Sequence, residues 1–560
     1  MANGTTFTYR NSFGGIWVDD PKDPFSDTAK PNEWTPALNE KWTWGRDRAY
    51  GVNLGGLFVL EPFISPALFQ KYPNTRDEWT LSEAMAADEA GGGLKQIEDH
   101  YDTFITEKDI ADIAGAGLNW LRVPIGYWAI ETWPGEPFLA KTSWTYFLRV
   151  IEWARKYGLR VVIDLHAVPG SQNGLNHSGR LGTINFLSGN MGIANAERTL
   201  YYLRILTEYF SQPQYKNVVQ SIALVNEPLA GDIGADPLSS FYLKAYDELR
   251  AVTGFGEGNG PYIAVQDGLA GLAIWNNLLP GGDRVLMDGH SYFAFGGDNP
   301  APIDVVGEEG QPGGTWPSQA CTAWAGMYNE SRNTIGPTFC GEFSAAPNDC
   351  GLFIRAVGVE STHPQCALYN DWENYSQAMK DGLQNFIMAS FDSFGDWFFW
   401  TWKIGPSQAG RVEAPLWSYK LGLDNEWIPS DPRTAVGKCA SLNVASTPFT
   451  GSFQPNRLGQ EPSPTISAEY SAQFPWPPTS IPNADVPVDL LPTYTNTAPA
   501  VTLPVPTFTG APASATEGLD GWFNDNDSQG APTPVAGCTY PIGDPPTFDV
   551  LPATPCTGLV

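Results

Sequence analysis

VVQSIALVNEP, residues 218–228, is a short apolar run that ends abruptly in an amide, a carboxylate and a proline. A continuous apolar run of this length is typical of a strand that is buried on both faces of a parallel sheet. The same pattern recurs in AYGVNLGGL (49–57), LNWLRVPIG (118–126), LRVVIDLHA (159–167), YIAVQDG (262–268), RVLMDGHSY (284–292), PTFCGEFS (337–344) and GDWFFWTWK (395–403). The repetition predicts a series of buried parallel strands.

Helical periodicity fills the intervals between these strands. Trp144, Phe147, Leu148, Ile151 and Ala154, for example, follow one another at the spacing of a single helix face. Eight strands alternating with helices predict an α/β fold, a (β/α)8 TIM barrel with long loops, over residues 46–440. A doubly wound open sheet is the alternative. It is disfavoured because no GxGxxG motif follows the first strand.

Two segments of different composition flank the barrel region. Residues 1–45 are polar and turn-rich, and we expect an N-terminal extension with Trp17, Trp34, Trp42 and Trp44 as anchors. Residues 441–560 hold 21 of the 48 prolines and only one basic residue, Arg457. This composition predicts a Pro-rich acidic tail, either linker-like or packed on the barrel. In the packed case, Phe474, Trp476, Trp522 and Phe523 are the expected contacts.

The charge balance restricts the partners of the chain. Acidic residues outnumber basic residues 61 to 32, which gives a net charge of −29. A surface this negative repels phosphate backbones and anionic lipid, so nucleic-acid and membrane-surface functions are disfavoured, whereas a neutral polysaccharide is compatible. No CxxC pair or His/Cys cluster has the spacing of zinc ligands, and we expect neither a metal nor a cofactor.

The cysteines and glycosylation sequons indicate an exported protein. Sequons begin at Asn3, Asn176, Asn329, Asn374 and Asn526, and they accompany cysteines that an oxidising compartment would pair. We expect the disulfides Cys350–Cys366, Cys538–Cys556 and Cys321–Cys439, with Cys340 buried and reduced between apolar neighbours. Since Met1 starts no signal peptide and no apolar stretch reaches 18 residues, we expect the targeting segment outside this sequence.

Polar side chains gather where the predicted strands end. They are Glu61, Arg122, His166, Asn226, Glu227, His290, Tyr292, Glu342, Trp400 and Trp402. In a barrel these ends meet at one mouth, which carries the catalytic groups. A structural ion pair can explain any single member of the set, because a buried charge without a partner costs several kcal/mol. It does not explain why the whole set falls at strand ends.

Two of these residues suit glycoside hydrolysis. A retaining glycosidase needs a carboxylic acid that protonates the leaving oxygen and, ~5–5.5 Å away, a carboxylate that attacks the anomeric carbon. Glu227 and Glu342 end the fourth and seventh strands, on opposite sides of the mouth, and we predict that they are the acid/base and the nucleophile. Arg122 would keep Glu342 ionised. The Glu342 anion and the enclosed site would keep Glu227 protonated near neutral pH.

The ordered motifs of the chain resemble glycoside hydrolase family 5 and, more narrowly, its fungal exo-β-1,3-glucanases. They are YGVNLGGLFVLEPFISPALF, LRVPIGYW, VIDLHAVPGSQNG, LVNEP, GHSYFAF, GEFSAA and FFWTWK, and they span about residues 50–440. The polar N-terminal segment resembles that of the membrane-anchored branch, in which the anchor precedes this segment. The resemblance implies a β-glucan substrate and a secreted or cell-surface enzyme, and we expect a monomer.

The resemblance also assigns substrate contacts. Asn226 would hold the sugar 2-hydroxyl, Tyr292 would touch the nucleophile, and Trp400 would stack under the sugar ring. Glu61 would bind the non-reducing-end glucose, and Phe295 would form half of an aromatic clamp at the entrance. The family residues matched by Arg122, His166 and His290 complete the surroundings of the sugar.

Three positions depart from the family pattern, the first being Leu57, where the family often has Trp. Leu175-Asn176 stands where the family often has Phe-Asp, so half of the clamp is missing and an amide replaces a carboxylate that recognises the terminal sugar; Asn176 remains a predicted substrate contact. We therefore expect weaker action on long β-1,3-glucan. The rival substrates are β-1,6-linked glucan, short oligosaccharides and diglycoside conjugates, and transglycosylation is a further outcome.

Two other functional classes are disfavoured. A non-catalytic cell-wall glycan-binding barrel would not need both Glu227 and Glu342. An esterase would need a GxSxG elbow before a helix, and the HSG at 177–179 is not such an elbow.

Overall fold

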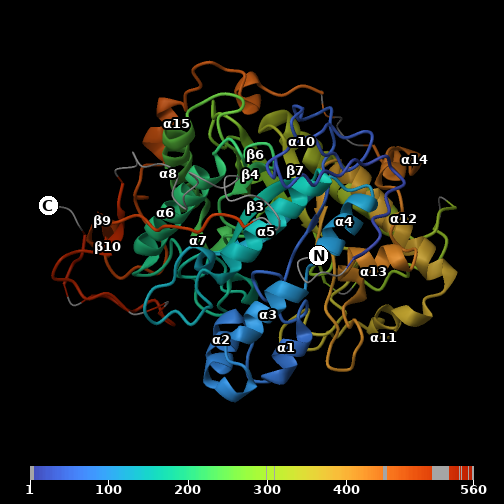
Figure 1. The fold of residues 1–560 in the computed structure, drawn as a ribbon, viewed down its shortest axis with the longest axis horizontal. Coiled ribbons are helices and arrows are strands. Elements are labelled where there is room, and N and C mark those ends of the chain that lie inside the picture. Colours follow the sequence, from blue (N-terminus) through green and yellow to red (C-terminus); the bar gives the residue numbers. More distant parts are fainter. Residues whose placement is uncertain are drawn as a thin grey trace.

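The computed structural model describes residues 6–557 apart from 298, 308–309, 446–448, 450, 508–528, 542, 544 and 553. Eight parallel strands pair in sequence order and close into a barrel, with β1 beside β8 (Figure 1). They are β1 (Tyr50–Asn53), β2 (Trp120–Gly126), β3 (Arg160–Ala167), β4 (Val219–Ala223), β5 (Tyr262–Gln266), β6 (Val285–His290), β7 (Thr338–Phe343) and β8 (Trp397–Phe399). Each lies inside a segment predicted as a strand, so the predicted TIM barrel is confirmed.

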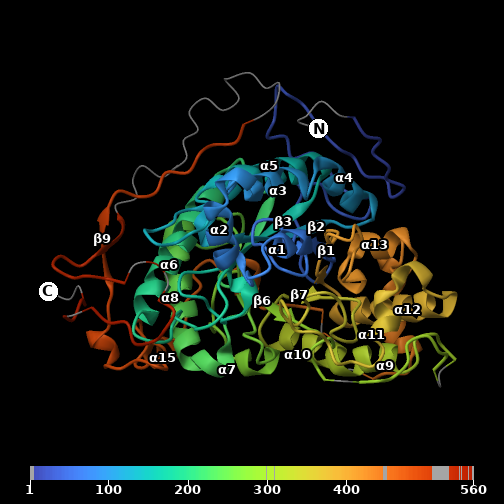
Figure 2. The ribbon, with the colours of Figure 1, turned by 90° about the horizontal axis from the view of Figure 1, so that it is seen from below.

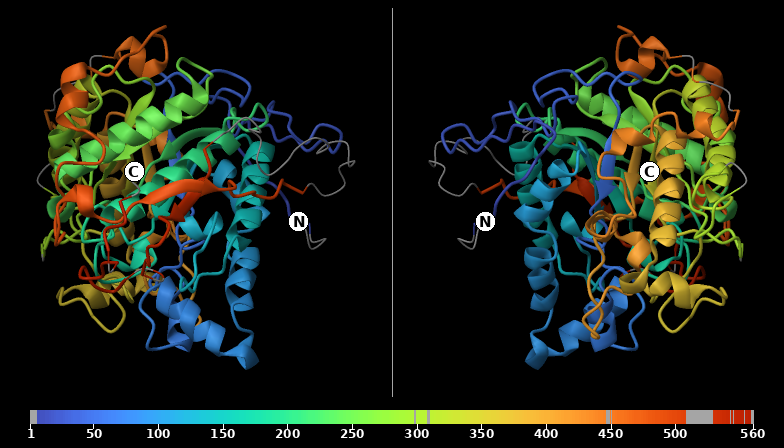
Figure 3. Two further views of the ribbon diagram at one scale, coloured as in Figure 1. Left: turned by 90° about the vertical axis from the view of Figure 1, so that its left-hand side faces the viewer. Right: turned by 90° about the vertical axis from the view of Figure 1, so that its right-hand side faces the viewer.

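Helices surround the barrel in the alternating order that the sequence predicted. The principal ones are α4 (Glu107–Gly115), α5 (Thr142–Tyr157), α6 (Gly192–Phe210), α8 (Ala235–Thr253), α10 (Gly326–Thr334) and α12 (Gln377–Phe394). Shorter helices are α7 (Ala230–Ile233), α9 (Trp316–Ala320), α11 (Cys366–Asn370), α13 (Tyr419–Asp424) and α14 (Lys438–Ser441). The connection after β1 also contains α1 (Pro66–Lys71), α2 (Glu78–Ala87) and α3 (Lys95–Thr103), which group at one end of the molecule (Figures 1 and 3).

An aromatic cluster closes the barrel at the amino ends of its strands. The ring of Trp120, the first residue of β2, lies 5.1 Å from that of Trp42 and 5.7 Å from that of Trp44. Both N-terminal tryptophans are buried there, as predicted. Trp34 is half-buried and packs on Phe13. Trp17, the remaining predicted anchor, is exposed, and its ring lies near the Lys156 ammonium.

The described part of the tail packs along the outside of the barrel (Figures 2 and 3). It contains α15 (Ala468–Gln473) and the antiparallel pair β9 (Tyr494–Ala498) and β10 (Ala531–Pro534). The Val501 amide donates to the Tyr201 hydroxyl of α6 at 2.8 Å, and Trp476 lies 6.2 Å from Phe241 of α8. Phe474 is buried as expected, whereas Trp522 and Phe523 lie outside the described residues. The segment boundaries at 45/46 and 440/441 stay a prediction.

The predicted cysteine pairing is confirmed. Cys321–Cys439, Cys350–Cys366 and Cys538–Cys556 are disulfide-bonded, and Cys340 is a buried free thiol. The first of these bonds ties α14 to the segment between α9 and α10. Within the described chain, no helix combines the length and the apolar character that a membrane crossing requires.

Candidate active site

Arg122 is the centre of the polar network at the mouth. Its guanidinium, fully buried on β2, lies 2.8 Å from a carboxylate oxygen of Glu342 and 3.1 Å from one of Asp164. It also donates to the side-chain oxygens of Asn226 at 2.8 Å and Asn53 at 3.0 Å. Burial lowers the pKa of Arg122, but the surrounding carboxylates outweigh burial and raise it. The guanidinium is therefore a fixed charge that holds β1, β3, β4 and β7 in register at their carboxyl ends.

Glu342 is held by a second donor on its other oxygen. The Tyr292 hydroxyl donates to Glu342 Oε2 at 2.9 Å, while Arg122 contacts Oε1. The preceding residue must be glycine, because a Cβ at Gly341 would collide with the carboxylate of Asp288. Both oxygens are thus held in a fixed orientation, as a nucleophile requires.

Glu227 lies just beyond β4, which ends at Ala223, and the LVNEP residues form a loop. Its backbone φ of 45° is in the left-handed region, which costs a non-glycine residue about 1–3 kcal/mol and is concentrated at functional sites. His290 Nδ1 lies 2.7 Å from Glu227 Oε1, and His177 Nε2 lies 2.8 Å from Oε2. Each carboxylate oxygen therefore has its own imidazole.

These two imidazoles reverse the protonation that we expected for Glu227. Burial raises the pKa of its carboxyl group, but the hydrogen bonds from His177 and His290 outweigh burial and hold the pKa well below its usual range. Burial lowers the pKa of His177, but Glu227, Glu61 and Glu342 raise it to about 9. In the free site both imidazoles favour the ionised carboxylate, and the contact with His177 was not foreseen when we expected Glu227 to be protonated near neutral pH.

The two glutamates are close enough to act on one bond. An oxygen of Glu227, an oxygen of Glu342 and a ring nitrogen of His290 all lie within 4.8 Å of one another. Retaining glycosidases have carboxyl groups ~5–5.5 Å apart, whereas inverting ones need ~6.5–9.5 Å to admit a water. The spacing suits direct attack by one carboxylate.

An aromatic wall lies beside the glutamates. The Trp400 indole, just after β8, is nearly parallel to the His166 ring and stacks with it, with an interplanar angle of 6° and centroids 5.4 Å apart. His166 Nδ1 lies 2.6 Å from Asp164, which fixes the ring. The absence of a side chain at Gly55 lets the Trp400 indole pack there, since a Cβ at this position would lie 2.8 Å from the indole.

Several buried polar atoms at this mouth have no hydrogen-bond partner among the described residues. They include Glu61 Oε1, His166 Nε2, Asn226 Nδ2 and Trp417 Nε1. Buried polar groups are nearly always satisfied in folded proteins, so a cluster of unsatisfied ones suits a polar ligand with many hydroxyl groups. Burial raises the pKa of Glu61 to about 8, helped by the charges of Glu342 and Glu227 and opposed by His177. Glu61 is therefore neutral at pH 7 and can donate a hydrogen bond.

The rim carries a second aromatic group. The Tyr292 ring lies 5.3 Å from that of Trp417 and 5.8 Å from that of Phe295, which is exposed. Leu175 is exposed in the loop after β3, and Asn176 is half-buried at the start of the 3₁₀ turn Asn176–Ser178. Trp402 belongs to the core instead: it is buried, and its indole nitrogen donates to Asp109.

Four residues of the network were not singled out from the sequence: Asn53, Asp164, Asp288 and His177. Asp164 and Asp288 each stand two positions before a predicted site histidine on the same strand, and this alternation could have revealed them because residues i and i+2 share a face. His177 follows no such rule, since it lies in the loop between β3 and α6. Sequence periodicity carries no signal for it.

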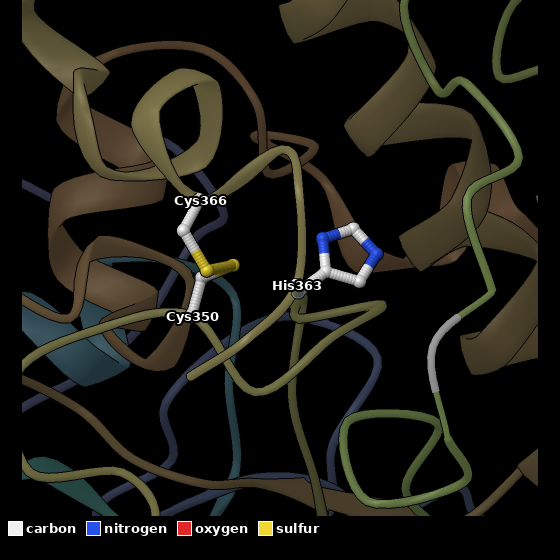
Figure 4. Close-up of side chains that lie close together, drawn as sticks. All are labelled: Cys350, His363 and Cys366. Atoms are coloured by element: carbon white, nitrogen blue, oxygen red, sulfur yellow. A yellow bond between two sulfur atoms is a disulfide. The ribbon is translucent and has the colours of Figure 1, made fainter. Parts of the chain in front are cut away.

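A separate cluster, formed by Cys350, His363 and Cys366, brings sulfur and nitrogen atoms together in the segment after β7 (Figure 4). The two sulfurs are bonded to each other, and His363 Nε2 lies 3.2 Å from the Asn299 carbonyl. Metal sites use deprotonated cysteine thiolates, so the disulfide form of this cluster is a structural crosslink.

Comparison with known proteins places this site in a family. The model of the cellulase family, glycosyl hydrolase family 5, matches residues 85–382. The chain is 36% identical over 471 residues to probable glucan 1,3-beta-glucosidase D of Neosartorya fischeri, which covers 78% of the chain and 53% of that protein. It is 36% identical over 455 residues to glucan 1,3-beta-glucosidase D of Emericella nidulans, and the match covers 76% of the chain and 52% of that protein. The chain thus spans about half the length of these curated relatives.

Solved structures support the fold. The crystal structure of AoRut matches with a TM-score of 0.52 at 21% identity, covering 70% of this chain and 99% of that one. The rutinosidase from Aspergillus niger matches with a TM-score of 0.50 at 19% identity, covering 69% and 99%. With the family model matching more than half of the sequence, this chain belongs to glycosyl hydrolase family 5.

Proposed function

We propose that the chain is a retaining β-glycosidase that releases glucose from the non-reducing end of β-1,3-glucan, with Glu342 as the nucleophile and Glu227 as the acid/base. The observation that carries the proposal is the placement of these carboxylates within 4.8 Å of each other, each in a different environment. The names of the relatives, glucan 1,3-beta-glucosidase, support the substrate. A non-catalytic glycan-binding barrel would have no use for this pair.

In the first step, Glu342 attacks the anomeric carbon while Glu227 donates its proton to the glycosidic oxygen. The bond from carbon to that oxygen breaks, and the sugar becomes an ester of Glu342. Arg122 and Tyr292 orient the attacking carboxylate through their contacts at 2.8 and 2.9 Å. Their fixed donors also stabilise the carboxylate when it leaves again in the second step.

In the second step, water attacks the anomeric carbon and gives a proton to Glu227, while the bond to Glu342 breaks. Two inversions at one carbon give overall retention. Asn226 Nδ2, His166 Nε2 and Glu61 Oε1 are the groups proposed to bind sugar hydroxyls, and Trp400 is the proposed platform for the ring. An acceptor sugar in place of water would give transglycosylation.

NMR spectroscopy of the first product tests the proposal. Laminarin, pustulan and gentiobiose should be compared, with the β-anomer of glucose expected to appear first and laminarin to be cleaved. An initial α-anomer would refute retention.

Mutation separates the proposed roles of the two glutamates. Glu342→Ala should lose turnover and regain it with azide, whereas Glu227→Gln should retain turnover of aryl glucosides with good leaving groups. The exposed Glu360→Ala is a matched control that should change nothing.

We also propose that the enzyme acts outside the cell, in the secreted space or at the cell surface. Three disulfides support this, since such bonds persist in oxidising compartments. A membrane anchor outside this sequence and a monomeric state stay predictions.

A further inference from the structure

Both oxygens of the proposed acid/base are occupied in the free site. His290 Nδ1 lies 2.7 Å from Glu227 Oε1, and His177 Nε2 lies 2.8 Å from Oε2. A general acid must bring one oxygen within about 2.6–3.2 Å of the atom that it protonates. One of the two imidazoles therefore stands where the leaving group has to be.

Exposure identifies which imidazole this is. The His290 side chain is fully buried on β6, whereas the His177 side chain is 19% exposed. His177 also belongs to a single 3₁₀ turn in a loop, which can shift more easily than a barrel strand. His177 therefore covers the open side of Glu227, the side from which a substrate enters.

The contacts of Asn173 bear on which partner holds the proton between His177 and Glu227. The Asn173 amide nitrogen lies 3.0 Å from His177 Nε2, and its oxygen accepts from the Leu175 amide at 2.9 Å, which fixes the amide orientation. An N–H donor beside Nε2 favours a neutral imidazole that accepts hydrogen bonds, with the proton on Glu227. The negative charge of Glu342 favours the imidazolium. The two arrangements differ only in the position of one proton.

We propose that His177 is a positioning residue that shares the catalytic proton with Glu227 in the free enzyme and gives up its place on Oε2 to the leaving group. This inference rests on the proposed function and adds a residue that the resemblance to the family did not supply. When the glycosidic oxygen approaches, the N–H bond of His177 breaks and an O–H bond forms on Glu227. The neutral ring then withdraws toward the open side. The carboxyl group so formed faces the oxygen that it protonates.

The pairing has a consequence for the pH dependence of kcat/KM. The pair keeps its last proton until the pH passes the pKa of His177, which burial lowers but Glu227 raises to about 9. Without an imidazole at this position, that proton is lost at the lower pKa of Glu227 alone. Glu61, Glu342, His166 and His290 also face His177 or Glu227. His177 lowers the pKa of Glu61, so replacing His177 moves the titration of Glu61 up, opposite to the shift expected for the pair.

His177→Asn is the test, because asparagine can still donate to Glu227 but does not titrate. We expect the alkaline limb of kcat/KM for phenyl β-glucoside to move down by about one pH unit or more. His363→Asn, a change of a buried histidine outside the mouth, is the matched control and should leave the limb in place. With β-glucosyl fluoride, whose leaving group needs no proton, wild type and His177→Asn should show the same limb.

Coincident alkaline limbs for wild type and His177→Asn on phenyl β-glucoside would overturn the inference, as would an equal shift on the fluoride. Melting curves identify a variant that fails to fold, and His177→Gln then takes its place with the same expected shift. If the proposed function itself fails, wild type will cleave neither β-glucoside or will invert the anomer. These outcomes differ from the result that would overturn the inference alone, which is a retaining enzyme whose pH profile does not change when His177 is replaced.

Discussion

Glu61 has an environment unlike that of the two proposed catalytic carboxylates. Arg122 lies against Glu342, and two imidazoles lie against Glu227, whereas burial is the main influence on Glu61 and raises its pKa to about 8. A carboxyl group with a raised pKa is neutral below that value and charged above it. We therefore expect Glu61 to donate a hydrogen bond at neutral pH, whereas Glu342 accepts hydrogen bonds from Arg122 and Tyr292.

Glu61→Gln should therefore reduce kcat/KM only slightly below pH 8. Glutamine retains a neutral donor, so we expect kcat/KM within a few-fold of wild type at pH 6, whereas Glu61→Ala should lose roughly tenfold or more, the value of one lost hydrogen bond. Above pH 8 the wild-type carboxyl ionises and the Gln variant does not, so their rates should diverge there. Equal losses for Gln and Ala at pH 6 would show that Glu61 acts as a carboxylate.

Sequence reasoning at this scale identified side chains better than protonation states. Glu227, Glu342 and Arg122 could be predicted because strand ends in a barrel must meet. The charge on Glu227 could not be predicted, because it depends on His177, which a loop brings to it. A loop contact has no period in the sequence.

Among the elements, the loop from β3 to α6 distinguishes this chain from the family pattern. It places the exposed Leu175, the half-buried Asn176 and His177 on consecutive positions. The sequence predicted that each strand exists and is a buried parallel strand. The strands are shorter than the apolar runs that predicted them, because β4 ends at Ala223 and β8 spans only Trp397–Phe399. The apolar residues beyond each strand continue into loops that are buried as deeply as the strand, so hydrophobicity could not mark the strand end.

Leu175→Phe combined with Asn176→Asp should raise kcat/KM on laminarin oligomers. The ring would add a flat face opposite Phe295, and the carboxylate would add a charge-assisted hydrogen bond worth about 1.5–3 kcal/mol, or roughly ten- to a hundredfold in binding. Gentiobiose hydrolysis is the comparison and should change less. A lower kcat/KM on laminarin, or a wild type that already prefers long laminarin to gentiobiose and aryl glucosides, would refute this account of specificity.

At the scale of the whole molecule, the sequence did not decide whether the tail is a linker or a segment packed on the barrel. Its described residues bury Leu491, Val501 and Leu503 against the same apolar core as the barrel helices. Composition alone suggested an extended chain, whereas the described tail also contains α15 and the strand pair β9–β10. Its contact with α6 and α8 could not be predicted, because isolated leucines between prolines have no period that would reveal a partner surface.

We propose that the tail and the barrel unfold together. Leu490 and Leu491 are adjacent, but the first is 43% exposed and the second 1% exposed. Leu491→Ala should lower the free energy of unfolding by about 2–5 kcal/mol, the usual cost of truncating a buried leucine, whereas Leu490→Ala should cost little. Urea unfolding followed by tryptophan fluorescence measures both, with activity retained in folded samples because neither residue lies at the mouth. If Leu491→Ala instead produces a separate early transition that leaves the barrel midpoint unchanged, the tail is an independent unit, and its contacts add nothing to the stability of the barrel.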